Sequence, residues 1–170
     1  MVIPFQARPR PKRFPRGRSL FAALVAAVVA AVATLLGPTS QAPAVVPANI
    51  RVVDGDTVDA VVPPGPGEAA GARPMKRYRL VGFDTPETVQ AGCGAELALG
   101  ERAKERLREL VATGPVRLAV DEGHTDRWGR GLATLTVGGR DVGTTLIREG
   151  LAVPYSGKGR RIDWCEKLRG

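Results

Sequence analysis

Apolar and β-branched residues gather in five short segments between residues 50 and 137, and polar, Gly or Pro residues separate them. Segments of this length and composition are typical of β-strands. In the third segment, apolar and polar positions alternate from Arg79 to Phe83. The sequence Asp-Gly-Asp between the first two segments indicates a tight turn or a β-bulge. The five predicted strands are 50–53, 57–62, 75–83, 116–120 and 132–137.

Two further segments have the spacing of a helix. In residues 95–112 the apolar positions form one stripe, and a Gly-Pro pair at 114–115 ends it. Residues 141–150 predict a short helix with Asp141 as N-cap and Gly150 just beyond its end. Short strands with two interposed helices predict an α+β fold, a small and mostly antiparallel barrel of OB type with helices packed on it. The stripe comprises Leu99, Ala103, Leu107, Leu110 and Val111.

Residues 1–44 have a different composition. Residues 1–19 carry six basic side chains and no acidic one, and residues 20–36 carry no charge. An A-x-A-like site then ends at Ala44, so the order is that of an export signal, with cleavage expected after Ala44. The alternative is an uncleaved membrane anchor, because seventeen apolar residues reach the lower limit for spanning a bilayer. In both cases we expect the basic end to stay in the cytoplasm and residues 45–170 to be exported as one domain.

Residues 1–19 also account for most of the net positive charge of the chain. The whole chain has a net charge of +8, but residues 45–170 carry 19 basic and 17 acidic side chains. Global charge therefore does not identify the partner, and any basic binding site must be local.

The exported part contains two cysteines, Cys93 and Cys165. In an exported protein one disulfide is the natural interpretation, and two buried free thiols are the alternative. A zinc site has little support, because His124 is the single histidine and the chain has no C-x-x-C motif.

Carboxylates and arginines occupy the predicted strand ends. Asp56 and Asp84 offer the oxygen ligands that a hard cation such as Ca²⁺ or Mg²⁺ prefers. Arg79 and Arg130 carry planar guanidinium groups that bind phosphate oxygens in pairs. Glu87 is a further carboxylate that can act on water. Each group alone is explained as a turn or surface loop, but together they are what phosphodiester hydrolysis requires.

Four stretches of the chain carry a resemblance to a known family. In this order along residues 50–155, they look like the staphylococcal nuclease (thermonuclease) family. The resemblance implies an OB barrel with added helices and calcium-dependent hydrolysis of DNA or RNA. The stretches are "VVDGDTV", "YRLVGFDTPET", "DRWGRGLATL" and "LIREGLAVPY".

Matching the motifs of this family residue by residue implies a role for each site residue. One calcium ion would be held by Asp56, Asp84 and the backbone carbonyl of Thr85. Glu87 would be the general base or water-positioning group. The two phosphate-binding arginines would be Arg79 and Arg130.

Two aromatic residues are candidates for substrate binding. Trp128 stands where the family more often has Tyr, and either stacks on a base or packs under its loop. Tyr155 falls near the place of nucleotide-contacting tyrosines in the family. The basic run of Lys158, Arg160 and Arg161 could guide a phosphate backbone, but we expect a solvated tail there.

The resulting expectation is an exported or membrane-anchored monomeric nuclease. Three alternatives stay open: a non-catalytic OB-type module that binds nucleic acid, a scaffold at the cell envelope, and a phosphodiesterase for small nucleotides. Retention of Glu87 and both arginines argues against the first alternative.

Overall fold

The main sheet of the protein is mixed and follows the strand order β1-β6-β7-β4-β3-β2, with β8 paired to β7. Neighbouring strands are antiparallel except for β4 and β7, which are parallel. The computed structural model describes residues 44–47, 49–64, 67, 69 and 71–170. The strands of this sheet are β1 (Ala44–Val45), β2 (Asn49–Asp54), β3 (Thr57–Val61), β4 (Lys76–Leu80), β6 (Val116–Thr125), β7 (Gly131–Val137) and β8 (Arg140–Asp141).

A second, two-stranded sheet pairs β5 (Gly82–Asp84) with β9 (Val153–Tyr155). The sequence predicted one continuous strand over 75–83, and the structure divides it at Val81. The backbone N–H of Val81 still bonds to Ala133, but Gly82 has a φ of 94°. This positive φ, which glycine adopts readily, turns the chain away from β7 and towards β9.

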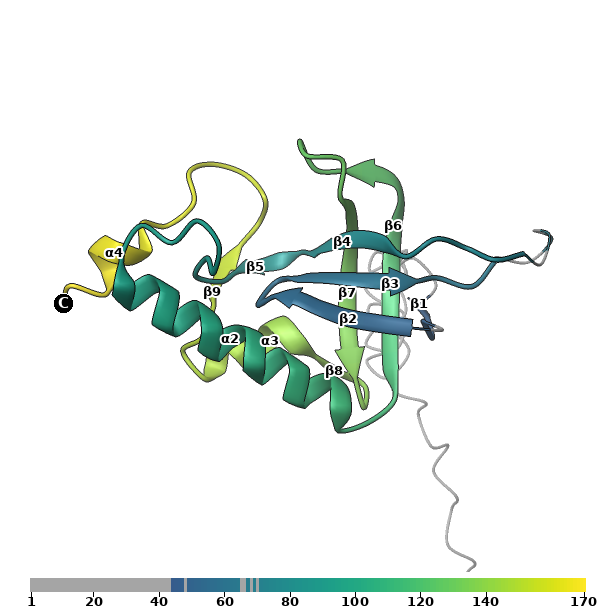
Figure 1. Cartoon of the computed structure of the whole chain (residues 1–170), viewed down its shortest axis with the longest axis horizontal. Helices are drawn as coiled ribbons and strands as arrows, with labels where there is room; N and C mark the ends of the chain where they lie inside the picture. Colours follow the sequence, from purple (N-terminus) through teal and green to yellow (C-terminus); the bar gives the residue numbers. More distant parts are fainter. Residues whose placement is uncertain (1–43, 48, 65–66, 68, 70) are drawn as a thin grey trace, which may run out of the picture. The chain divides into compact units, whose positions relative to one another are not determined.

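Among the described residues, the helices are α2 (Gly94–Ala112), α3 (Val142–Arg148) and α4 (Trp164–Lys167). Figure 1 shows α4 beside the beginning of α2, and these two helices are in contact. Asp141 caps α3 as expected, because its side chain accepts a hydrogen bond from the Thr144 N–H. The short elements β1, β8, β9 and α4 were not predicted, because two to four residues carry too little periodicity to identify them.

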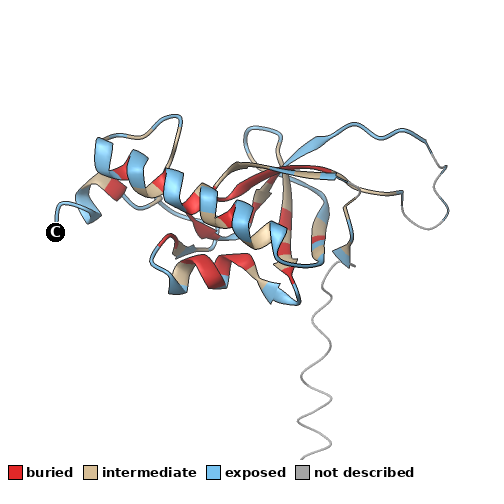
Figure 2. Ribbon diagram, turned by 60° about the horizontal axis from the view of Figure 1, so that its bottom comes forward, coloured by how far each residue is buried: buried red, intermediate tan, exposed pale blue. Residues whose placement is uncertain are grey.

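Helix α2 packs one face on the protein and leaves the other in solvent (Figure 2). Leu107 and Ala103 of the predicted stripe are buried, and Leu99, Leu110 and Val111 pack partly buried against the core. Glu96 and Gly100 also lie on the buried face. The remaining core comes from the strands and α3, with Leu80, Leu118, Leu135 and Leu146 fully buried.

The α+β class follows from this architecture, but the predicted barrel is not closed. The five predicted strands correspond to β2, β3, β4, β7 and β6, and each is bonded to the next in that order. Among the described residues no pairing joins the two ends of the sheet, β1 and β2.

Residues 1–43 of the expected export segment lie outside the described residues, as does its apolar stretch 20–36. Within the part of the chain that the structure describes, none of the helices has the length and apolar content required to cross a membrane.

Candidate active site

The turn between β2 and β3 brings Asp56 against the segment that follows β5. The Asp54 side chain accepts hydrogen bonds from the Gly55 N–H and the Thr88 hydroxyl, so it shapes the turn. A Cβ on Gly55 would lie 2.8 Å from Thr85 Oγ1, so only glycine allows this approach. Asp56 is buried, and its Oδ2 accepts a hydrogen bond from the Thr85 N–H at 3.4 Å.

Arg79 joins the two buried aspartates. Its Nη2 lies 2.9 Å from Asp56 Oδ2 and 3.1 Å from Asp84 Oδ1. The same guanidinium donates to the carbonyl oxygens of Leu80 and Phe83. Register places Arg79, near the end of β4, opposite Thr57 at the start of β3, which explains how Arg79 reaches the β2–β3 turn. Because both carboxylates bond to one nitrogen atom, they converge on a single point.

Burial governs the charge of Asp84, whose side chain is 1% exposed. Burial raises the pKa of the Asp84 carboxyl above its ordinary value, and hydrogen bonds from Arg161 oppose this shift. Burial likewise raises the pKa of Asp54, with the Gly55 N–H acting in the opposite direction. In both groups the nearby donors therefore offset part of the cost of burying the charge.

Arg161 also belongs to this cluster, and the prediction of a solvated tail was wrong for it. Its Nη2 lies 2.6 Å from Asp84 Oδ1, and its Nη1 lies 2.5 Å from Glu87 Oε1. Lys158 and Arg160 are exposed, as the prediction requires. The local sequence could not separate these three residues, because the partners of Arg161 lie more than 70 residues away along the chain.

The backbone around Glu87 is held by α2. Glu96 accepts hydrogen bonds from the N–H groups of Glu87 and Gly92, at 3.3 and 2.7 Å. Gly100 lies one turn further along the helix, where a Cβ would stand 2.8 Å from the Pro86 carbonyl oxygen. Helix and loop are therefore in direct backbone contact. Glu96 was missed because its charge, read from the sequence, assigns it to the exposed face of the helix, whereas the structure buries it.

The loop before β7 places Arg130 and Trp128. Asp126 accepts hydrogen bonds from the backbone N–H and Nε of Arg130 and from the Trp128 N–H. Burial acts to raise the pKa of Asp126, but these hydrogen bonds together have a larger effect. The pKa of Asp126 therefore lies below its ordinary value. Arg130 Nη1 also donates to the Thr57 hydroxyl at 3.3 Å. Trp128 is 60% exposed, and the guanidinium of Arg127 lies 4.0 Å from its ring centre.

A pocket of about 730 Å³ is lined by residues of β4, of the loop before β7 and of the segment 155–161. Arg79 and Arg161 line it, and both also bond carboxylates that do not line it. Trp128 and Tyr155 line it too, and the Tyr155 hydroxyl donates to the Gly159 carbonyl. Six basic side chains and one acidic side chain face this pocket, which makes it a local site for an anion. The basic residues are Arg79, Arg127, Arg130, Lys158, Arg160 and Arg161, and the acidic residue is Asp126.

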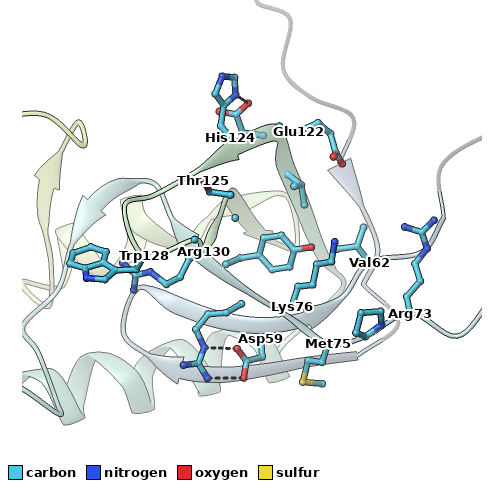
Figure 3. A pocket seen from close by; sticks show the side chains of 18 of the residues that line it. Asp59, Val62, Arg73, Met75, Lys76, Glu122, His124, Thr125, Trp128 and Arg130 are labelled. Carbon is cyan, nitrogen blue, oxygen red and sulfur yellow. Dashed lines mark hydrogen bonds and ion pairs between the residues drawn. The ribbon is translucent and has the colours of Figure 1, made fainter.

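A second hollow, of about 1210 Å³, shares Trp128 and Arg130 with this pocket and is shown in Figure 3. Lys76 and Arg73 face it from the β3–β4 side, and Glu122 and His124 face it from β6. One of its acidic residues, Asp59, is bonded to Arg51 and Arg77 in the sheet. Asp56, Asp84 and Glu87 line neither pocket, but Arg79 and Arg161, which bond these carboxylates, line the smaller pocket and not this hollow. We therefore take the smaller pocket as the candidate active site.

Cys93 and Cys165 form a disulfide, with their Cα atoms 5.9 Å apart. This distance lies within the range that a disulfide requires. The bond ties the loop after Glu87 to α4. Among the described residues, one group of three potential metal ligands has its ligand atoms within 4.8 Å of one another. It consists of these two sulfurs and a carboxylate oxygen of Glu96. Because both sulfurs are in the disulfide, that cluster is not a metal site.

The donor set around Arg79 fits a hard divalent cation. Two carboxylates, from Asp56 and Asp84, point at one position that a guanidinium nitrogen now contacts. Thr85 follows directly in the chain and is buried beside them. Oxygen ligands of this kind suit Ca²⁺ or Mg²⁺ and do not suit soft metals.

Several known proteins are similar to this chain. A family model described as "Staphylococcal nuclease homologue" matches residues 77–168. The curated protein "Endonuclease YncB" of Bacillus subtilis (strain 168) is 39% identical over 103 residues, which is 60% of this chain and 44% of the relative. "Protein ParB" of Escherichia coli is 35% identical over 123 residues, 67% of this chain and 59% of the relative. "Thermonuclease" of Staphylococcus hyicus is 33% identical over 103 residues, 61% of this chain and 55% of the relative. The chain thus spans roughly half the length of the relatives it matches.

Proposed function

This chain belongs to the staphylococcal nuclease family, and we propose that it is a metal-dependent nuclease that hydrolyses phosphodiester bonds in DNA or RNA. One observation carries the proposal: Arg79 bonds the two buried aspartates on one side and faces a basic pocket on the other. The names of two relatives, an endonuclease and a thermonuclease, support the same activity. The order of β2, β3, β4, β7 and β6 supports the OB-type description, since this fold is a partly open five-stranded barrel.

The residues of the pocket have separate tasks in this proposal. Asp56, Asp84 and the carbonyl of Thr85 hold one Ca²⁺ ion, which when bound polarises the phosphoryl group of the substrate. Arg79 and Arg130 bond the phosphate oxygens and stabilise the negative charge that develops on them. Asp126 holds Arg130 in the orientation that this task requires.

Glu87 is the proposed base. Its carboxylate is 37% exposed, so water reaches it, while Asp84 is buried. It accepts a proton from the attacking water, or orients that water, as the new P–O bond forms. The P–O bond to the leaving oxygen breaks, that oxygen takes a proton from solvent water, and Glu87 returns its proton to solvent, which leaves a phosphate monoester and an alcohol.

The test is nucleic-acid cleavage by the purified full-length chain, with single-stranded DNA and RNA as substrates. We expect cleavage with Ca²⁺, loss of cleavage with a chelator, and a fall in kcat of roughly 10²–10⁴-fold in Glu87→Gln. Glu101→Gln, an exposed change on α2, is the control and should cleave like the wild type. A folded wild-type protein that cleaves neither substrate with any divalent cation would overturn the proposal and favour a binding module.

The proposed location is outside the cytoplasm. Residues 1–44 resemble an export signal or an anchor in composition, and a disulfide suits an oxidising compartment. Fractionation of cells that make the full-length chain tests this, with N-terminal sequencing of the recovered protein. A mature chain that starts at Val45 supports cleavage, an intact chain in the membrane supports the anchor, and an intact chain in the cytosol contradicts both.

A further inference from the structure

Arg161 bonds two carboxylates at once, and both belong to the proposed site. Its Nε donates to Asp84 Oδ1 at 2.7 Å, while its Nη1 donates to Glu87 Oε1 at 2.5 Å. The planar guanidinium therefore fixes the distance and the angle between the two carboxylates. Its side chain is 34% exposed, so the group is partly withdrawn from solvent.

The two carboxylates depend on Arg161 to different degrees. Asp84 also accepts from Arg79 and from the indole N–H of Trp164, so it keeps partners if Arg161 is removed. In the described part of the chain, Arg161 is the partner that the structure records for the Glu87 carboxylate. Without that partner the Glu87 side chain can rotate freely, because α2 bonds its backbone and not its carboxylate.

The position of Arg161 is itself built by the fold. Trp164 is buried three residues later and donates to Asp84 Oδ2 at 3.3 Å. Cys165 follows, and its bond to Cys93 ties α4 to the loop between Glu87 and α2. Trp164 and Cys165 both follow within four residues of Arg161. Their contacts therefore hold Arg161 beside the carboxylates.

We propose that Arg161 is a positioning residue of the active site, which aims the Glu87 carboxylate, and that the Cys93–Cys165 disulfide holds Arg161 in place. This inference rests on the proposed function. Arg161 does not need to touch the substrate in this role. When a cation binds to Asp84, the bond from Arg161 to Glu87 remains available, so the orientation of the base is kept.

The first experiment compares Arg161→Ala with Arg169→Ala at saturating Ca²⁺. Arg169 is an exposed arginine of the same segment, so the control removes the same charge. We expect Arg161→Ala to lower kcat roughly 10–100-fold with little change in KM, as for a lost supporting contact. Arg161→Lys should recover part of kcat, and added guanidinium ion at low concentration should recover part of it in Arg161→Ala.

A second measurement does not depend on activity. Calorimetry of Ca²⁺ binding without substrate should give a Kd roughly 3- to 15-fold lower in Arg161→Ala than in the wild type, because a cation beside Asp84 has been removed. If Arg161 merely supported the fold, the variant would bind Ca²⁺ more weakly, melt earlier and gain nothing from guanidinium. That set of results would overturn the inference.

The disulfide is tested in combination with Arg161. Cys93→Ser/Cys165→Ser should lower kcat, and adding Arg161→Ala should cause little further loss, because both changes act through Glu87. Fully additive losses would contradict the link between the disulfide and Arg161. An active wild type with an unaffected Arg161→Ala variant would refute this inference alone, whereas an inactive, folded wild type would refute the proposed function.

Discussion

Trp128 is the most exposed large aromatic residue beside the proposed pocket, and two guanidinium groups lie over its ring. The centres of Arg127 and Arg130 lie 4.0 and 5.0 Å from the ring centre. This arrangement pre-orders a flat, cationic platform of the kind on which nucleic-acid bases stack.

From this platform we predict that Trp128→Ala raises KM for a single-stranded oligonucleotide by roughly 10-fold or more, with a smaller effect on kcat. The reason is that stacking contributes about 1–3 kcal/mol per base to binding. Trp128→Phe retains an aromatic face and should retain most of the affinity. Steady-state kinetics with both variants decides the matter, and an unchanged KM in Trp128→Ala would show that the ring only packs under its loop.

Single residues also show what sequence patterns can and cannot predict. Arg79, Asp84 and Glu87 were assigned together because they lie within nine residues of one strand and its end. Arg161 was missed because its two partners lie 77 and 74 residues earlier in the chain. Nothing in the composition of residues 158–161 distinguishes an arginine that bonds buried carboxylates from one in solvent.

At the scale of elements, α2 contacts the site through a glycine. A Cβ on Gly100 would lie 2.8 Å from the Pro86 carbonyl oxygen and 2.9 Å from that of Glu87. A helix normally gains about 1 kcal/mol when an interior glycine becomes alanine. Here the added methyl group must displace the backbone that carries the proposed base.

We therefore predict that Gly100→Ala lowers kcat roughly 10- to 100-fold, because small displacements of a catalytic group have effects of that size. Gly94→Ala is the matched control, since it lies on the same helix with no atom within 4 Å of the new Cβ. It should leave kcat unchanged. Equal activity of the two variants would mean that the loop adapts to the methyl group at no cost.

Three strands of the sheet are joined by one carboxylate. Asp59 on β3 accepts hydrogen bonds from Arg51 on β2 and from Arg77 on β4, which stand opposite it in register. The hydrogen bond from Arg77 is the main cause that lowers the pKa of Asp59 below 3.8, and burial opposes it. A lowered pKa means that the stabilisation is present above that pH and is lost as the pH falls through the folded-state value.

Asp59→Asn should accordingly reduce the free energy of unfolding by roughly 1–3 kcal/mol near pH 7. The difference from the wild type should shrink as the pH falls from 3.8 through the lower folded-state pKa, where the wild-type carboxyl also becomes neutral. Urea denaturation at several pH values measures this. Asp121→Asn, at an exposed aspartate, should cost little, and a pH-independent deficit in Asp59→Asn would contradict the assignment.

Elements of sufficient length were predictable from the sequence, and short ones were not. Helix α2 repeats its pattern over five turns, so its bounds were predicted to within one residue. The split of the third predicted strand depends on Gly82 and on pairing with β9, a partner 70 residues away. Closure of the barrel is a property of the whole sheet, which the alternation within single strands cannot determine.

At the scale of the whole molecule, the disulfide closes a long loop. Cys93 and Cys165 are separated by 72 residues, and the chain-entropy estimate for such a loop is about 4 kcal/mol. We predict that Cys93→Ser/Cys165→Ser lowers the free energy of unfolding by up to that amount. Dithiothreitol should lower the denaturation midpoint of the wild type and leave that of the variant unchanged, and equal midpoints for the two proteins would refute the prediction.

The contacts of Arg161 also bear on when, during synthesis of the chain, the proposed site becomes complete. Asp84 and Glu87 are synthesised early, and their arginine follows 77 and 74 residues later. At ribosomal rates of about 5–20 residues per second, several seconds separate them. A partly synthesised chain therefore carries carboxylates without their orienting group, and we expect it to cleave nucleic acid at least roughly 10-fold more slowly than the finished chain, as for Arg161→Ala. In the proposed function, full activity would therefore begin only after the chain has grown past Arg161.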